Sequence, residues 1–154
     1  MIFISHRGNI NGKGERENSP EIIDNVISLG YQVEIDIWKI EDSFFTGHDY
    51  QEFEIKIDWL KERNNDLWVH CKNVESIEFF NSEKIDLNYF WHEEDLMTLT
   101  SKGFMWVYPG KQPLKNSISV MPEIHDDDTS MCIGICSDFI EKYRLDYENR
   151  KLFN

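Results

Sequence analysis

The side chains best suited to chemistry in this sequence begin at the end of its first apolar run. His6 and Arg7 come directly after the mostly apolar residues 1–4. An arginine guanidinium binds phosphate or carboxylate through a fork of parallel hydrogen bonds, and a histidine titrates near neutral pH. The pair indicates either a phosphate site or a surface pair that caps a helix or binds a carboxylate.

A second chemical signal is the segment VEIDI at residues 33–37. In a strand, Glu34 and Asp36 point to one face while their neighbours point to the other. Two carboxylates about 6 to 7 Å apart along one face repel each other unless a cation neutralises them, and their oxygens suit Mg²⁺ or Ca²⁺. The alternative is a solvated edge strand that shows both carboxylates to water.

Other polar and aromatic residues recur where apolar runs end. His70 and Lys72 alternate in WVHCK, as Glu34 and Asp36 do, and His48 lies in the turn TGHD. Because ligands bind at the carboxyl ends of parallel strands, we expect these groups to converge. Further candidates for the pocket are Trp106, Tyr108, Glu123 and His92, with Trp106 and Tyr108 equally suited to the core.

Several neighbouring residues favour structural roles. Glu17 and Asn18 are expected to brace a loop and the start of the next helix, and Asp138 is expected to cap the last strand. The segment HDDD at residues 125–128 could be a metal site, but a polar loop is the better interpretation.

The elements that must position these residues alternate between strands and helices. Apolar strand-like runs begin near residues 2, 31, 67, 88, 104, 117 and 132, with an extra strand or hairpin arm at 44–49. Helices are predicted at 20–29, where Ser19 and Pro20 form a typical start, and at 53–63, 74–81, 95–102 and the C-terminus. Such alternation is typical of a parallel sheet covered by helices, and it fits an open sheet or a closed barrel.

Composition narrows the class of protein. The 154 residues predict a single domain over 1–154, with 40% hydrophobic residues and a net charge of −13. An acidic surface repels nucleic acid, no apolar run approaches a membrane span, and no leader peptide is recognisable. The three cysteines fit reduced, buried thiols. We therefore expect a cytoplasmic protein, whose oligomeric state the sequence leaves open.

Four short motifs, in order, resemble one enzyme family. They read HRGN at 6–9, ENSPE at 17–21, EIDIW at 34–38 and GHD at 47–49. Together they resemble the glycerophosphodiester phosphodiesterases of the phosphatidylinositol-phospholipase-C-like superfamily, and WVHCK, WVYPG and GICSDF match later family strands more weakly. The resemblance implies an α/β fold, a compact (β/α)8 TIM-type barrel with shortened or missing helices.

The resemblance also implies roles for single residues. His6 and His48 would be the catalytic acid–base pair, and Arg7 and Lys72 would bind the substrate phosphate. Glu34 and Asp36 would bind a divalent metal ion. His70 stands where the family usually has a third, carboxylate ligand, which shifts the expected metal from Ca²⁺ toward Mg²⁺, Mn²⁺ or a softer ion. Glu123 is a candidate to supply the missing carboxylate.

The function implied is metal-dependent hydrolysis of a small glycerol-type phosphodiester to an alcohol and a phosphomonoester, as in lipid metabolism. The expected cofactor is Mg²⁺, with Ca²⁺ or Mn²⁺ as alternatives. Two other functions stay open at this point. One is a phospholipase-C-like lyase that forms a cyclic phosphate, and the other is a barrel that binds a phosphate ligand without turnover.

Overall fold

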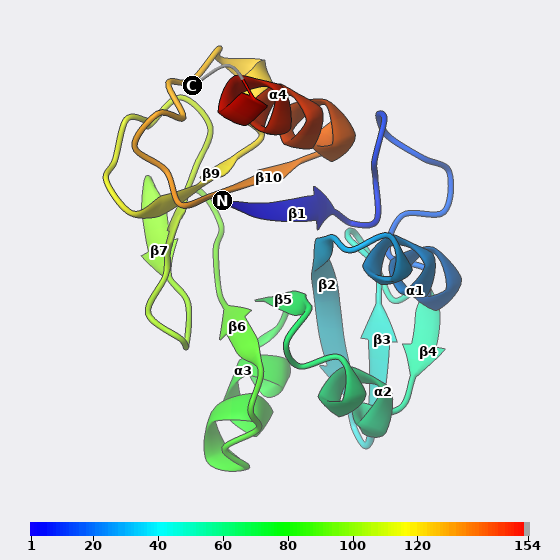
Figure 1. Cartoon of the computed structure of the whole chain (residues 1–154). Coiled ribbons are helices and arrows are strands. Elements are labelled where there is room, and N and C mark those ends of the chain that lie inside the picture. The colour runs from blue at the N-terminus through cyan, green and yellow to red at the C-terminus, as the bar shows by residue number, and fades with distance from the viewer. Residues whose placement is uncertain (153–154) are drawn as a thin grey trace.

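The protein forms one ten-stranded mixed sheet with helices on part of its outer surface (Figure 1). The computed structural model describes residues 1–152. The strands are β1 (Ile2–His6), β2 (Gln32–Ile40), β3 (Ser43–Thr46), β4 (Phe53–Ile55), β5 (Leu67–Cys71), β6 (Asn88–Phe90), β7 (Met97–Leu99), β8 (Met105–Val107), β9 (Ser117–Val120) and β10 (Gly134–Ser137). The helices are α1 (Pro20–Ser28), α2 (Ile57–Glu62), α3 (Val74–Ser82) and α4 (Ile140–Leu152), with a short 3-10 turn η1 (Pro122–Ile124).

Seven of the strands run parallel, in the spatial order β6-β5-β2-β1-β10-β9-β8. The antiparallel hairpin β3–β4 continues beside the second half of β2, and β7 pairs antiparallel with β8. The sheet curls into a half-barrel, so the carboxyl ends of the parallel strands surround one region (Figure 1).

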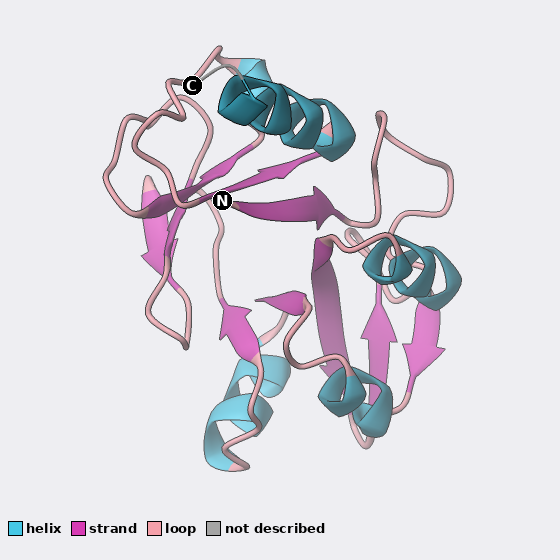
Figure 2. Ribbon diagram, viewed as in Figure 1, coloured by secondary structure: helices cyan, strands magenta, loops and turns pink. Residues whose placement is uncertain are grey.

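The prediction of a (β/α)8 TIM-type barrel is wrong. Eight β/α units need eight helices and usually about 200 residues or more, whereas residues 1–152 hold four α-helices. Helices α1 and α3 pack on β2 and α4 packs on β1 and β10, whereas the chain around β7 is mostly loop (Figure 2). The β8–β9 connection carries Pro109, Gly110 and Pro113, which disfavour a helix, so strand follows strand without a covering helix.

Two predicted helices also differ from the structure. Within 53–63 the first residues form β4 and only Ile57–Glu62 is helical. The segment 95–102 contains β7 instead of a helix, because it forms a hairpin with β8 through a turn at Gly103, whose φ is +83°. Helix α1 begins at Pro20 as predicted, although the Ser19 side chain makes no cap hydrogen bond.

Strand alternation divides the core into two clusters. Val33, Ile35 and Ile37 of β2 point outward, into the cluster beneath α1 and α3. A second cluster fills the inside of the half-barrel, where Ile4, Trp68, Phe90, Trp106, Ile118 and Cys136 meet. The three cysteines are free and buried, as predicted. None of the helices within residues 1–152 has the length and apolar character needed to cross a bilayer.

Candidate active site

A cavity of about 430 Å³ lies at the carboxyl ends of the parallel strands, above the interior cluster. It gathers most of the residues that the sequence singled out, and it adds apolar residues from the loops after β8 and β9. Its lining residues are His6, Arg7, Glu34, His48, His70, Lys72, His92, Glu93, Trp106, Tyr108, Pro109, Val120, Met121 and Ile124.

Strand register explains why these groups meet. His6 at the end of β1 lies opposite Glu34 of β2, and Asp36 of β2 lies opposite His70 of β5. On β1, β5, β6 and β10, an apolar residue of the interior cluster is followed two positions later by a polar residue, as Ile4 is followed by His6. The polar layer therefore lies directly above the apolar layer.

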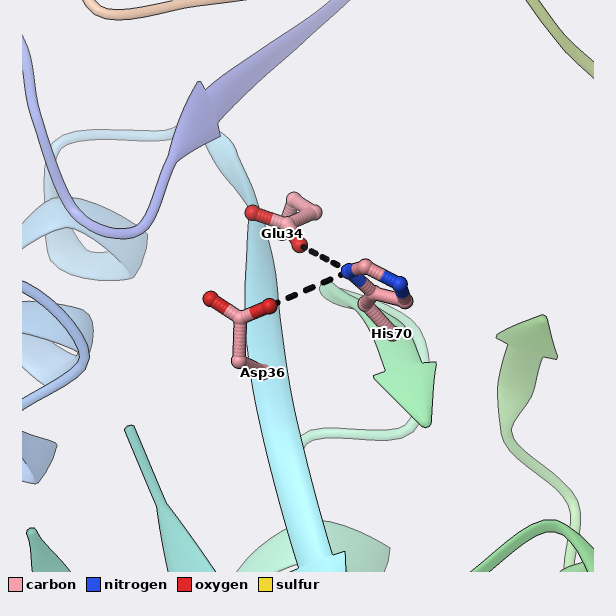
Figure 3. A group of neighbouring side chains, drawn as sticks. All are labelled: Glu34, Asp36 and His70. Carbon is pink, nitrogen blue, oxygen red and sulfur yellow. Dashed lines mark ion pairs between the residues drawn. The ribbon is translucent and has the colours of Figure 1, made fainter. Parts of the chain in front are cut away.

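Asp36 is fully buried and surrounded by positive and donor groups. Its Oδ2 lies 3.0 Å from Arg7 Nε and accepts a hydrogen bond from Asn18 Nδ2 at 2.9 Å. Its Oδ1 lies 3.1 Å from His70 Nδ1 (Figure 3). The same oxygen lies 3.5 Å from Lys72 Nζ. Burial alone would raise the pKa of Asp36, but the interactions with His70, Arg7 and Lys72 outweigh it and hold the pKa well below its usual range. Asp36 is therefore expected to be ionised near neutral pH.

Glu34, two residues earlier, is buried with far less support. Burial and the charge of Asp36 raise its pKa above the usual value. Its Oε1 lies 3.8 Å from His70 Nδ1 (Figure 3), and its Oε2 lies 3.9 Å from His6 Nε2 and has no hydrogen-bond partner. A buried carboxylate oxygen without a partner is costly unless a proton or a cation completes it.

Glu34, Asp36 and His70 fit a divalent cation. One ligand atom from each lies within 4.8 Å of the others, and a bound divalent cation holds its ligand atoms about 3 Å apart. His70 Nε2 lies 2.8 Å from the backbone oxygen of His92, which can only accept, so Nε2 carries a proton. Nδ1 thus either is protonated or directs a lone pair at two carboxylates, and a lone pair in that place suits a metal ligand.

His6 is oriented by Asp138, a residue whose sequence position predicts only a cap for the last strand. Its Nδ1 lies 2.7 Å from Asp138 Oδ1, which also accepts a hydrogen bond from Asn9 Nδ2 at 2.7 Å. Burial lowers the pKa of His6, but the hydrogen bond with Asp138 and the charge of Glu34 outweigh burial and raise it. The position of Asp138 at the end of the strand beside β1 is the signal that could have identified it.

His48 lies on the same cavity, in the turn after β3. Its Nδ1 lies 2.7 Å from Asp49 Oδ1, and its side chain is 38% exposed. Burial and the positive charge of Arg7 lower the pKa of His48. The two predicted catalytic histidines therefore share one cavity and differ in environment.

Asn18 and Glu17 brace the site from the loop before α1. Asn18 is buried with a φ of +64°, a left-handed conformation that asparagine tolerates, and its Oδ1 accepts from the backbone N–H of Asp36 at 3.0 Å. Glu17 accepts from Asn9 at 2.6 Å and lies 3.6 Å from Arg7. The ENSPE motif thus positions the metal-binding and phosphate-binding candidates.

The remaining candidate pocket residues lie in different places, three on the cavity and one outside it. Trp106 is buried in the interior cluster and forms the cavity floor, while Tyr108 is 40% exposed on the wall. His92 packs edge to face against Tyr108, with ring centroids 5.0 Å apart. Glu123 lies outside the lining, where it accepts hydrogen bonds from Ser137 Oγ and Tyr143 Oη, and it is therefore not placed to replace a metal ligand.

The segment 125–128 forms a turn, in keeping with the interpretation as a polar loop. Asp127 accepts a hydrogen bond from the backbone N–H of Gly110, and Asp128 accepts one from the backbone N–H of Ser130. The first of these bonds joins the β8–β9 connection to the β9–β10 connection, and the second lies within the β9–β10 connection.

Comparison of the chain with protein-family models, with curated proteins and with solved structures finds no match. The resemblance to the glycerophosphodiester phosphodiesterases therefore stays a prediction carried by short motifs, and the site geometry is the basis for a proposal about function.

Proposed function

We propose that the protein is a metal-dependent phosphodiesterase that hydrolyses a small phosphodiester to an alcohol and a phosphomonoester. One observation carries the proposal. A single cavity is lined by His6 and His48, by the cationic side chains of Arg7 and Lys72, and by Glu34 and His70, which form a Glu–Asp–His cluster with the buried Asp36 beneath them. This set contains what phosphoryl transfer needs: a base, an acid and positive charge around the phosphoryl oxygens.

Arg7 and Lys72 supply the anion-binding side of the cavity. Both line it, and both lie beside Asp36, which fixes their positions without removing them from the cavity surface. An arginine fork and a lysine ammonium held in place bind phosphoryl oxygens without the cost of ordering two long side chains.

The two histidines divide the proton transfers. His48, whose pKa is lowered, takes a proton from the attacking water. His6, held by Asp138, gives a proton to the alkoxide that leaves as the phosphorus–oxygen ester bond breaks. The lowered and raised pKa values of the two imidazoles support this assignment.

Glu34, Asp36 and His70 would hold the divalent cation, for which we propose Mg²⁺ or Mn²⁺. When bound there, the cation would neutralise negative charge that grows on the phosphoryl oxygens. The unpartnered Oε2 of Glu34 is the observation that favours an ion at this place.

The test is an assay of the purified protein on glycerophosphocholine, glycerophosphoethanolamine, glycerophosphoglycerol and bis(p-nitrophenyl) phosphate, each with Mg²⁺, Mn²⁺, Ca²⁺ or EDTA. We expect metal-dependent release that falls by about 10²–10⁴-fold in His6→Gln. His125→Gln, an exposed histidine outside the cavity, is the matched control.

Product analysis separates the alternatives. A cyclic phosphate would show that a substrate hydroxyl attacks in place of water, which is the lyase reaction. Stabilisation by inorganic phosphate without product from any of the four esters would contradict hydrolysis and support a phosphate-binding protein.

A further inference from the structure

The cavity has two chemically different walls at the same height in the half-barrel. On β1 and β5, the residues two positions after the interior cluster are His6 and His70. On β8 and β9, the equivalent residues are Tyr108 and Val120, which follow Trp106 and Ile118. One layer of inward side chains is therefore polar on one side and mostly apolar on the other.

Loop residues extend the apolar wall toward solvent. Pro109 follows Tyr108, and Met121 and Ile124 follow Val120; all of them line the cavity. Tyr108 is 40% exposed and Ile124 is 57% exposed, so this wall shows apolar surface to water beside a charged site. Covering such surface with an apolar group is favourable in proportion to the area removed from water.

We infer that the substrate carries an alkyl or aryl alcohol on one side of its phosphate, and that this group lies against the wall formed by Tyr108, Val120 and Ile124. This inference rests on the proposed phosphodiesterase function and specifies its substrate class. A phosphate held by Arg7 and Lys72 lies against the polar wall of the cavity. One of its two ester groups then faces the apolar wall on the opposite side.

Charge and size narrow the class further. Glu93 also lines the cavity and is exposed, and its carboxylate disfavours a second anionic group on the substrate. The volume of about 430 Å³ lies near the lower end of the range for small-molecule pockets. The expected substrate is thus a small monoanionic diester, and a bulky two-chain lipid is too large for this cavity.

The test compares glycerol 3-phosphate esters of ethanol, butanol and hexanol with glycerophosphoglycerol, under the metal conditions that give turnover. Because a chain lying against one open wall buries about half of its surface, we expect kcat/KM to rise by about twofold per methylene, half of the free-energy effect of full burial. The hexyl ester should then exceed the ethyl ester by on the order of tenfold. In Tyr108→Ser and Ile124→Ser this ratio should fall toward one. Leu145→Ser, an exposed leucine on α4, should keep it.

The possible outcomes test the apolar wall separately from the proposed phosphodiesterase function. Equal kcat/KM for all esters, or a preference for glycerophosphoglycerol, would overturn the apolar wall while leaving hydrolysis in place. Failure to turn over any ester would overturn hydrolysis. The wall would then be judged by calorimetry with ethyl- and hexylphosphonate: equal Kd values overturn it, and tenfold tighter binding of hexylphosphonate supports it.

Discussion

The two sides of the half-barrel differ both in what covers them and in what they present to the cavity. Strands β1, β2, β5 and β10 pack against α1, α3 or α4 and carry His6, Glu34, Asp36, His70 and Asp138. Strands β8 and β9 are joined to their neighbours by loops, a hairpin and the η1 turn, and the cavity residues there are Tyr108 and Val120. Buried charges thus lie where the scaffold is most heavily packed.

This difference has a physical reason. A buried ion network is stable only if its members are held in good geometry, because each uncompensated charge costs several kcal/mol. The packing of β2 beneath α1 and α3 and its pairing with β1 and β5 on either side supply that geometry. An apolar wall needs no such alignment, so strands joined by loops can supply it.

The largest expected effect comes from Asp36→Asn, which breaks the charged side at its centre. Removing this carboxylate leaves Arg7 and Lys72 without their buried partner, so we expect a loss of roughly 3–5 kcal/mol in the free energy of unfolding. Urea denaturation in EDTA measures it without a metal contribution.

Glu34→Gln is the control from the same strand face. Because the pKa of Glu34 is raised and its Oε2 lacks a hydrogen bond, neutralising it removes an unfavourable charge. Its stability in EDTA should be unchanged or higher, while its metal-dependent activity is lost. Equal destabilisation by both substitutions would show that the two carboxylates are not supported differently.

Asp138→Asn tests whether the positioning of His6 depends on the strand beside β1. Without the carboxylate, the His6 ring loses the partner that fixes its orientation and raises its pKa. We expect kcat to fall by on the order of 10²-fold with KM little changed.

Asp146→Asn on the exposed face of α4 is the matched control and should keep full activity. A change in KM alone would indicate that Asp138 supports substrate binding instead of the orientation of His6.

These contrasts also show how much the sequence could predict. Period-two alternation in VEIDI and WVHCK, with apolar runs around them, was enough to place Glu34, Asp36, His70 and Lys72 on one face. It was not enough to place Glu123, which lies in the η1 turn. Side chains in such a turn do not alternate between two faces as they do in a strand, so the sequence does not show where the Glu123 carboxylate points. Asp138 needed the β1–β10 pairing, which joins residues more than 130 positions apart.

The fold was predicted less well for a related reason. The parallel strands follow from local periodicity, and α1 follows from its apolar spacing and from Pro20 at its first position, but closure of a barrel depends on the connections between strands. Between β6 and β10 these connections are turns and a hairpin, so the strand count alone suggested more covering helices than the chain forms.

The pH dependence of kcat/KM tests the proposed role of His48. Because its pKa lies below the ordinary histidine value of 6.5, the His48 imidazole stays neutral, and able to accept a proton, at pH 6.5. An enzyme that uses His48 as its base should therefore lose activity only below pH 6.5. Asp49→Asn removes the hydrogen bond that raises the pKa and should move this acid limb further down.

Asp42→Asn, at the exposed turn before β3, is the control and should leave the profile in place. An acid limb above pH 6.5, or one that survives unchanged in His48→Ala, would contradict the assignment of His48 as the base.

The smallest effect is expected on the helix-poor side, at β7. This strand pairs with β8 along one edge, and its Met97 and Leu99 are 45% and 64% exposed. Leu99→Lys should change the free energy of unfolding by no more than about 0.5 kcal/mol, because no core contact is lost. A lysine on an apolar edge strand should also reduce self-association, measured by light scattering during refolding.

Leu87→Lys, at a leucine with 2% exposure, is the contrasting variant and should unfold the protein. A large loss of stability in Leu99→Lys would mean that β7 is covered in solution, and that the two sides of the half-barrel are more alike than the structure shows.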